Sequence, residues 1–139
     1  MSGFGECGML CLYRGEETAM SGLEGKSFDS PDEVREFKAH GRVELVNLAS
    51  GPVGRGTFEP GWKWSEDVKP LAGTDSCQVA HVGYVISGRM VVRMDDGSQH
   101  EFSPGETFNM PPGHDAWTEG DEPCVLVDFG GLRGYAQAG

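Results

Sequence analysis

Three residues in the second half of the chain, Cys77, His81 and His114, have side chains that can bind a transition metal. A thiolate and neutral imidazoles suit zinc, iron or copper in particular, and manganese and nickel complete the range of candidate ions. Asp75 or Glu66 could add a carboxylate. We therefore expect Cys77, His81 and His114 to be the ligands if the protein holds a divalent metal.

The spacing between Cys77 and His81 does not allow both residues to bind one ion unless the chain bends between them. On one straight strand they would lie about 13 Å apart, at roughly 3.3 Å per residue. Residues 78–80 are Gln, Val and Ala, so none of the usual turn formers is present. A metal-free protein stays an open alternative, in which Cys77 is a small buried hydrophobe, His81 hydrogen-bonds a neighbour and His114 belongs to a loop.

A cysteine nucleophile is a further hypothesis for the same residues. Cys77 and a histidine within hydrogen-bonding reach could support covalent catalysis. The sequence reveals no third group that would orient the histidine. It also contains no phosphate-binding glycine loop, dinucleotide-binding fingerprint or metalloprotease motif, so these enzyme classes are not indicated.

Four large aromatic residues, Trp62, Trp64, Tyr84 and Trp117, are many for one small domain. If they face the interior, they would form flat walls of a pocket for an apolar or aromatic ligand. Ordinary core packing is the alternative. We expect these four residues to line a ligand pocket.

Short runs of alternating residues, separated by glycine, proline and aspartate, dominate the chain from residue 42 onward. The 22 glycines and 8 prolines among 139 residues are typical of many short strands joined by turns. The predicted strands cover residues 42–48, 54–59, 62–68, 78–87, 89–94, 99–102, 107–110, 114–118 and 124–129. Because no βαβ spacing occurs, this pattern predicts an all-β sandwich or barrel of antiparallel strands.

One short helix is expected before these strands. Ser30 can cap a helix, Pro31 suits its first position and Glu33 completes a capping box. The helix would run to about Ala39 and end at Gly41. We expect it to pack against the outside of a sheet.

The chain is predicted to form one domain behind an N-terminal tail. Residues 1–24 are glycine-rich and show no sustained period of 2 or 3.6, which predicts a poorly ordered segment. Residues 25–139 are long enough to enclose one core. Met20 could be the natural start, a hypothesis that N-terminal sequencing of protein from its native source tests. Cys7 and Cys11 have no second pair of ligands nearby and do not indicate a zinc site.

The formal net charge of −11 shows which partners the chain does not suit. Nucleic acids and anionic membranes require clustered lysine and arginine on the binding surface. No stretch approaches the roughly 18 apolar residues that span a bilayer, and the N-terminus lacks the features of a signal peptide. We expect a cytoplasmic protein that binds a small molecule and could form a homodimer by covering an open sheet edge.

The order of turns and strands over residues 54–129 resembles the cupin superfamily. Gly105, Pro111 and Gly113 match its second motif, G-x5-P-x-G-x2-H, and the stretch from His81 to Gly88 matches the end of its first motif, G-x5-H-x-H-x3,4-E-x6-G. Segments similar to PGWKWSEDVKP, GTDSCQ, SGRM, MDDG and PPGHDAW also occur in a group of small bacterial cupin proteins. The resemblance implies a double-stranded β-helix, or jelly-roll, barrel around an enclosed pocket, with strands reversing at these glycines.

The usual metal ligands of the cupin family are altered in this chain. The resemblance puts His81 in the place of the family's glutamate, and Cys77 and Asp75 in the places of two histidines. Ala116 stands where the third histidine belongs. The habits of the fold suggest metal-assisted oxygenation or isomerisation. The loss of all four usual ligands favours instead a metal-free ligand-binding or sensor module, and both alternatives stay open.

Overall fold

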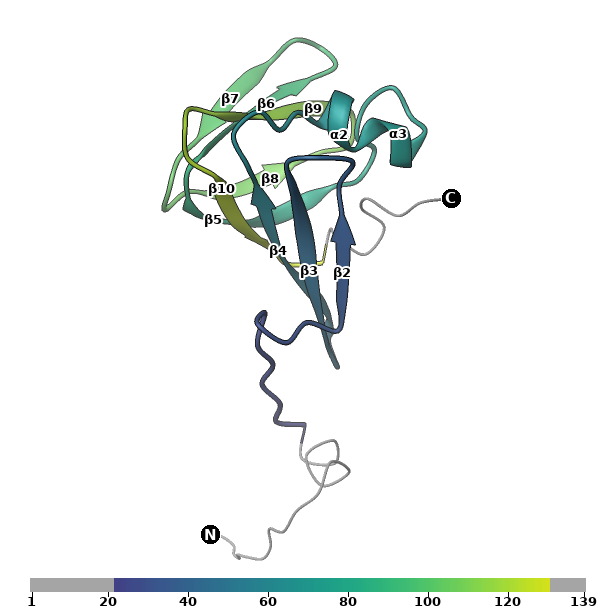
Figure 1. Ribbon diagram of the computed structural model, residues 1–139, viewed down its shortest axis with the longest axis vertical. Helices are drawn as coiled ribbons and strands as arrows, with labels where there is room; N and C mark the ends of the chain where they lie inside the picture. The colour runs from purple at the N-terminus through teal and green to yellow at the C-terminus, as the bar shows by residue number, and fades with distance from the viewer. Residues whose placement is uncertain (1–21, 131–139) are drawn as a thin grey trace, which may run out of the picture.

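The computed structural model describes residues 22–130 of the chain, and strands dominate them (Figure 1). The strands, in chain order, are β2 (Glu33–Glu36), β3 (Gly41–Leu48), β4 (Gly51–Phe58), β5 (His81–Ser87), β6 (Arg89–Met94), β7 (Gln99–Phe102), β8 (Thr107–Met110), β9 (His114–Glu119) and β10 (Cys124–Asp128). The two helical turns are α2 (Trp64–Asp67) and α3 (Lys69–Ala72).

The strands form two antiparallel sheets. One sheet has six strands in the order β2-β3-β4-β10-β5-β8, and the other has three in the order β7-β6-β9. In Figure 1 the three-stranded sheet lies above β10, β5 and β8, while β2, β3 and β4 extend downward. Apolar side chains from both sheets make one hydrophobic core. This architecture confirms the predicted all-β fold.

Strands β9 and β10 place every second residue in the core, and some of these residues are polar. The buried residues of the two strands are His114, Ala116, Thr118, Cys124, Leu126 and Asp128. A polar group at a core position is destabilising unless it has a hydrogen-bonding partner. The interior between the two sheets therefore contains polar side chains as well as apolar ones.

The predicted helix over residues 30–39 is wrong, because strand β2 takes its place. This strand pairs with β3 along its whole length. The Asp32 carboxylate accepts a hydrogen bond from the Asn47 N–H at 2.7 Å, and the Asp32 N–H donates to the Leu45 carbonyl at 2.8 Å. A capping pattern is a local signal, and pairing with β3 supplies the backbone hydrogen bonds that a helix would otherwise make.

The predicted strand over residues 62–68 is also wrong, because α2 begins within it and α3 follows at Lys69. The buried Asp67 carboxylate stabilises the α2 turn by accepting hydrogen bonds from the Lys63 N–H at 3.1 Å and from His40 Nδ1 at 3.0 Å. Trp62 and Trp64 are both buried, and Lys63 lies between them. Buried indoles two residues apart, with a lysine between them, give the alternating pattern that is typical of a strand. The backbone nevertheless turns here.

Glycines close the turns that the sequence predicts. Gly88, Gly105 and Gly113 have φ angles of +73°, +93° and +92°, which other residues rarely adopt. At Gly88, between β5 and β6, a Cβ atom would overlap the Pro123 carbonyl oxygen. These turns confirm the expected reversals of the barrel strands.

No helix within residues 22–130 has both the length and the apolar character that crossing a bilayer requires. The predicted tail lies outside the described residues, apart from residues 22–24, and so do Met20, Cys7 and Cys11.

Candidate metal centre

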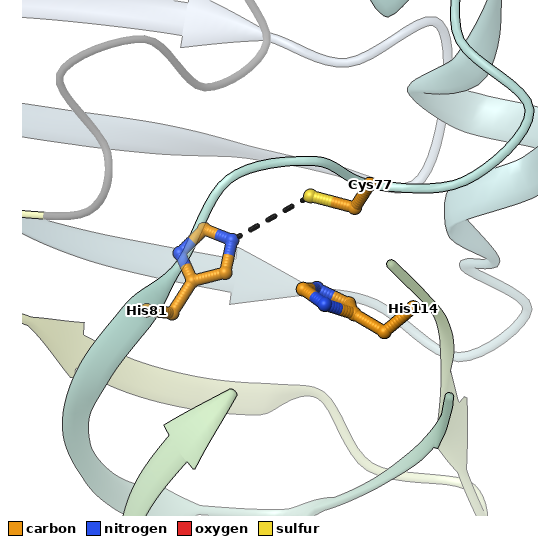
Figure 2. Close-up of side chains that lie close together, drawn as sticks. All are labelled: Cys77, His81 and His114. Atoms are coloured by element: carbon orange, nitrogen blue, oxygen red, sulfur yellow. Dashed lines mark hydrogen bonds between the residues drawn. The ribbon is translucent and has the colours of Figure 1, made fainter. Parts of the chain in front are cut away.

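Cys77, His81 and His114 lie together in the interior of the protein. The atoms with which they could bind an ion, one from each side chain, are all within 4.8 Å of one another. All three residues are buried. Figure 2 shows the thiol and the two rings around one common space; they come from the segment before β5, the start of β5 and the start of β9. The structure thus brings together the three residues that the sequence analysis selects as metal ligands.

A bend between Cys77 and His81 makes this arrangement possible. The Cys77 N–H donates to the His114 carbonyl at 2.7 Å, and the Cys77 carbonyl accepts from the Gly113 N–H at 2.6 Å. Residues 78–80 belong to no strand, and β5 begins only at His81. The straight strand that would separate the side chains by about 13 Å therefore does not form. Pairing with the turn before β9 sets the bend, without a turn-forming residue.

Hydrogen bonds determine which nitrogen of each imidazole carries the hydrogen. His81 donates from Nδ1 to the Asp128 carboxylate at 2.6 Å, and His114 donates from Nδ1 to the Pro111 carbonyl at 2.7 Å. Because a carbonyl and a carboxylate only accept, Nδ1 carries the hydrogen in each ring and Nε2 keeps its lone pair. In metalloproteins, a hydrogen bond from the other ring nitrogen to an acceptor of this kind orients the metal-binding histidine and raises its basicity. Both rings are therefore prepared as Nε2 ligands.

The separation of the ligand atoms matches a tetrahedral zinc-type site. With metal–sulfur bonds near 2.3 Å and metal–nitrogen bonds of about 2.0–2.1 Å, sulfur and nitrogen on one tetrahedral ion lie about 3.5 Å apart. Cys77 Sγ and His81 Nε2 are 3.7 Å apart. Because no spacing in the cluster exceeds 4.8 Å, small side-chain adjustments would bring all three atoms to one ion. The residues present fit a metal.

Burial governs protonation in this cluster. It raises the pKa of the Cys77 thiol to about 11; a backbone hydrogen bond with Val79 opposes this effect and the Asp128 charge adds to it. Burial also lowers the pKa of His114, although the hydrogen bond to the Pro111 carbonyl acts in the opposite direction. At neutral pH, without an ion, Cys77 is a thiol and His114 is neutral. A bound metal would take the place of the thiol proton.

Asp128 is a residue of the candidate site that the sequence analysis misses. Its side chain is 1% exposed and holds His81 by the hydrogen bond described above. The signal was present, because Asp128 continues the inward-facing series of Cys124 and Leu126 on β10, where a carboxylate needs a partner. The two carboxylates considered from the sequence are exposed, namely Asp75 and Glu66.

Asp128 also completes the arrangement that a cysteine nucleophile would need. The thiol of Cys77 lies 3.7 Å from His81 Nε2, and the Asp128 carboxylate orients His81 from the other side of the ring. The raised pKa of Cys77 acts against this function, because the thiolate is the nucleophile and reactive cysteines lie in partly exposed, electropositive surroundings. The site therefore favours metal binding over covalent catalysis.

A cavity of about 30 Å³ adjoins the cluster. This volume holds about two water molecules. His81, His114 and Asp128 contribute to its wall, and the rest of the wall consists of aromatic, aliphatic and methionine side chains. A ligand in this cavity would touch the candidate metal centre and an otherwise apolar surface.

Two of the four aromatic residues predicted to line the pocket do so, and two do not. Trp62 and Trp64 belong to the cavity wall. Tyr84 is 42% exposed, because it points outward from β5. Trp117 alternates with the inward-facing residues of β9 and lies outside, where two cationic side chains lie over its ring. The strand period of two thus removes Tyr84 and Trp117 from the predicted pocket.

The indole N–H groups of Trp62 and Trp64 are buried without a hydrogen-bonding partner. Among residues 22–130 they are the only buried side-chain nitrogen or oxygen atoms in that condition. Both rings line the same cavity. An unpaired buried donor is destabilising by about 1–3 kcal/mol, so a molecule that brings an acceptor to these groups would be favoured.

Comparison with known protein families gives a match in the second half of the chain. Residues 75–130 match the protein family described as Cupin domain. No curated protein matches the chain.

Similar solved structures support the jelly-roll architecture. An RmlC-like cupin from Shewanella frigidimarina is 18% identical, with a TM-score of 0.51 over 76% of this chain and 88% of that chain. A cupin from Silicibacter pomeroyi, named a sugar phosphate isomerase, is 20% identical, with a TM-score of 0.54 over 76% of this chain and 73% of that chain. A protein of unknown function from Acinetobacter is 18% identical, with a TM-score of 0.51 over 70% of this chain and 88% of that chain. At these identities the similarity shows the fold alone.

Proposed function

The chain carries a cupin domain, and from that premise we propose that it is a metal-binding cupin whose divalent ion is held by Cys77, His81 and His114. The convergence of three buried ligand atoms within 4.8 Å, two of them on imidazoles oriented through Nδ1, carries the proposal. Three protein ligands leave one position of a tetrahedral site open for water or substrate, whereas structural zinc sites use four. The centre is therefore of the kind that binds or transforms a ligand.

The donor set narrows the choice of ion. One thiolate and two imidazoles suit zinc, iron or copper, imidazole also suits nickel, and manganese prefers oxygen ligands. When bound, the ion would supply a Lewis acid for a ligand oxygen or, as iron or copper, a redox-active centre. Cys77, His81 and His114 would hold it, Asp128 would orient His81, and the apolar wall would exclude bulk water.

The ligand best suited to this cavity is a small organic molecule with an oxygen atom at each end. One oxygen would face the open coordination position, and the other would accept a hydrogen bond from Trp62 or Trp64. A space of about 30 Å³ admits little more than two water molecules. Met90 and Met110 also line the cavity, and their flexible, unbranched side chains can change rotamer to admit a larger molecule.

The cavity wall favours oxygenase-like chemistry or reversible binding over isomerisation. An isomerase that moves a proton between carbon atoms needs a free acid or base within reach. His81 and His114 would be committed to the ion, and Asp128 already accepts a hydrogen bond from His81. The described residues of the wall include no lysine or arginine for a phosphate group. We therefore extend to this chain the fold, and not the activity, of the cupin named a sugar phosphate isomerase.

Two competing functions use the same residues. In a metal-free binding or sensor module, the cavity alone would hold the small molecule. In a cysteine-dependent enzyme, Cys77 would be the nucleophile, His81 the base and Asp128 the orienting group. Both competitors predict a protein that contains no stoichiometric metal.

Elemental analysis of the purified full-length protein tests the proposal. Cultures are supplied with zinc, iron, copper, manganese and nickel, and metal content is compared in the unmodified chain, Cys77→Ala and His100→Ala. His100 is the matched control, because it is an exposed histidine on β7 that pairs with Glu106.

We expect about one ion per chain in the unmodified protein and in His100→Ala, and much less in Cys77→Ala. Circular dichroism establishes that the variants are folded. Absence of metal from the unmodified protein after growth with all five ions would refute the proposal and favour the metal-free alternatives. An equal metal content in Cys77→Ala would refute the ligand assignment.

A further inference from the structure

All three methionines that the structure describes lie around the candidate metal centre. Met110 and Met90 belong to the cavity wall together with His81 and His114. Met94 lies opposite His114 in the pairing of β6 with β9. The thioether sulfur of methionine is a ligand for copper(I), whereas zinc in proteins takes thiolate, imidazole and carboxylate ligands. The positions of these methionines therefore bear on which ion the centre holds.

One of the methionines is within reach of an ion in the centre. Met110 of β8 lies directly opposite His81 of β5, the strand beside it (Figure 1). Residues paired in this way direct their side chains to the same face, with Cβ atoms about 4.5–5.5 Å apart. Because methionine is unbranched and has three rotatable bonds, its sulfur can reach an ion bound at His81 Nε2. Met90 lies on the other sheet, and its strand partners are Thr118 and Phe102, which are not metal ligands.

Oxygen ligands are scarce on the same wall. Asp128 is the only residue of the described cavity wall whose side chain carries oxygen, and its carboxylate already accepts the hydrogen bond from His81. Non-haem iron centres commonly combine two histidines with a carboxylate, and manganese prefers oxygen ligands. Thiolate and thioether sulfur select copper(I) instead. The donors around this centre therefore favour copper over iron and manganese.

We propose that Met110 is a fourth ligand of the metal centre and that the ion it selects is copper(I). The inference rests on the proposed function, because it requires an ion bound to Cys77, His81 and His114. Copper sites that combine one thiolate and two imidazoles with a methionine hold the methionine by a long, weak bond. A small molecule can therefore displace the thioether, and the fourth position stays available to a ligand.

A comparison of copper with zinc distinguishes a ligand from a packing residue. If Met110 only fills space beside His81, its replacement changes the affinities for both ions alike. If its sulfur binds copper, the replacement weakens copper(I) binding and leaves zinc binding unchanged, because zinc does not use the thioether. Leucine has a similar volume and no sulfur, so Met110→Leu removes the ligand atom while the packing is kept.

Metal titrations of the full-length protein and of two variants test the inference. Copper(I) is added without oxygen, in competition with a chromophoric copper(I) chelator, and zinc is titrated separately against a zinc chelator. Met110→Leu is compared with Met90→Leu, the matched control, because Met90 belongs to the same wall but faces no metal ligand. X-ray absorption at the copper edge, on protein labelled with selenomethionine, detects a selenium atom bound to copper.

We expect copper(I) to bind more tightly than zinc, and Met110→Leu to lower the copper(I) affinity about tenfold without a change for zinc. Copper should have a selenium neighbour in the unmodified protein and in Met90→Leu, and none in Met110→Leu. Equal losses for both ions in Met110→Leu, an unchanged copper(I) affinity or a selenium neighbour that persists there would overturn the inference and leave the proposed function intact. A chain that binds neither ion would overturn both.

Discussion

The two faces of strand β5 invert the usual arrangement of a barrel strand. The inner face begins with a buried histidine held by a buried aspartate, whereas the outer face carries Val82, Tyr84 and Ile86 in exposed positions. A strand with one solvated face normally places apolar residues inside and polar residues outside. The difference shows two departures from the usual pattern of such a strand, and departures of this kind often lie at functional sites: the inward imidazole belongs to the candidate metal centre, and exposed apolar residues occupy the opposite face.

Removal of the inward imidazole is expected to have the largest effect. His81→Ala leaves two protein ligands; structural zinc sites bind their ion with about 10–16 kcal/mol, so the loss of one ligand in three should weaken binding by about 4 kcal/mol, or roughly 1,000-fold. Isothermal titration calorimetry with zinc measures this change. Val82→Ala, one position along on the outer face, should leave the affinity unchanged; equal losses in both variants would contradict the distinction between the faces.

A methyl group added to the inner face is expected to have the next largest effect. At Gly83 a Cβ atom would overlap the Val127 carbonyl oxygen, and it would lie 2.5 Å from the Phe108 ring. Because a backbone atom cannot move aside, Gly83→Ala should lower the free energy of unfolding by about 3 kcal/mol. Urea unfolding measures it. At Gly25 a Cβ atom meets nothing within 4 Å, so Gly25→Ala should change stability by less than about 0.5 kcal/mol. Similar values for the two variants would show that β5 and β10 are less closely packed than the structure indicates.

Loss of the carboxylate behind His81 should have an intermediate effect. Asp128→Asn keeps the size of the side chain and removes the charge that orients and polarises the imidazole. Outer partners of this kind change metal affinity by about 10–100-fold. Competition with a chromophoric chelator measures the zinc affinity. An affinity equal to that of the unmodified chain would remove Asp128 from the account, and complete loss of binding would make it a ligand instead of a positioning residue.

The pH dependence of metal binding separates the Cys77 thiol from the His114 imidazole. Because the pKa of Cys77 is raised to about 11, the thiol is protonated at neutral pH and must lose its proton when the ion binds. The pKa of His114 is lowered, so its ring is already neutral and loses none. The affinity should therefore increase about tenfold per pH unit between pH 7 and 9. Calorimetry in buffers of different ionisation enthalpy measures the released proton, which should disappear in Cys77→Ser.

The smallest effect is expected on the outer face. Ile86→Glu should change the free energy of unfolding by less than about 0.5 kcal/mol, because the side chain is half exposed. Chemical denaturation measures it. A large loss of stability or of bound zinc would mean that the two faces of β5 are not independent.

The strands and turns were largely predictable, because their signals are local. Alternation and turn residues located β5 to β10, and Gly88, Gly105 and Gly113 adopt the backbone angles for which glycine is suited. The errors arose where contacts with a segment distant in the sequence determine the local structure. The capping pattern at Ser30 is real, but the following residues pair with β3.

The ligand types were predictable from the sequence, and their geometry was not. The bend that brings Cys77 to His81 depends on the backbone pairing of Cys77 with His114. Nothing in the sequence of residues 78–80 predicts this pairing. Ala116, which stands at the place of a cupin histidine, lines the cavity two residues beyond His114 on the same face of β9. An imidazole thus lies in the interior two residues before the motif position, and a comparison of motif positions alone does not reveal this.

Cobalt substitution is the most direct measurement of the central claim. Co²⁺ added to the metal-free, full-length protein should saturate at about one equivalent, with the intense visible bands of a four-coordinate ion and a near-ultraviolet sulfur-to-cobalt band. Cys77→Ser should lose the sulfur band. A weak spectrum like that of cobalt in water, or a sulfur band that persists in Cys77→Ser, would contradict the proposal that Cys77, His81 and His114 form one metal centre.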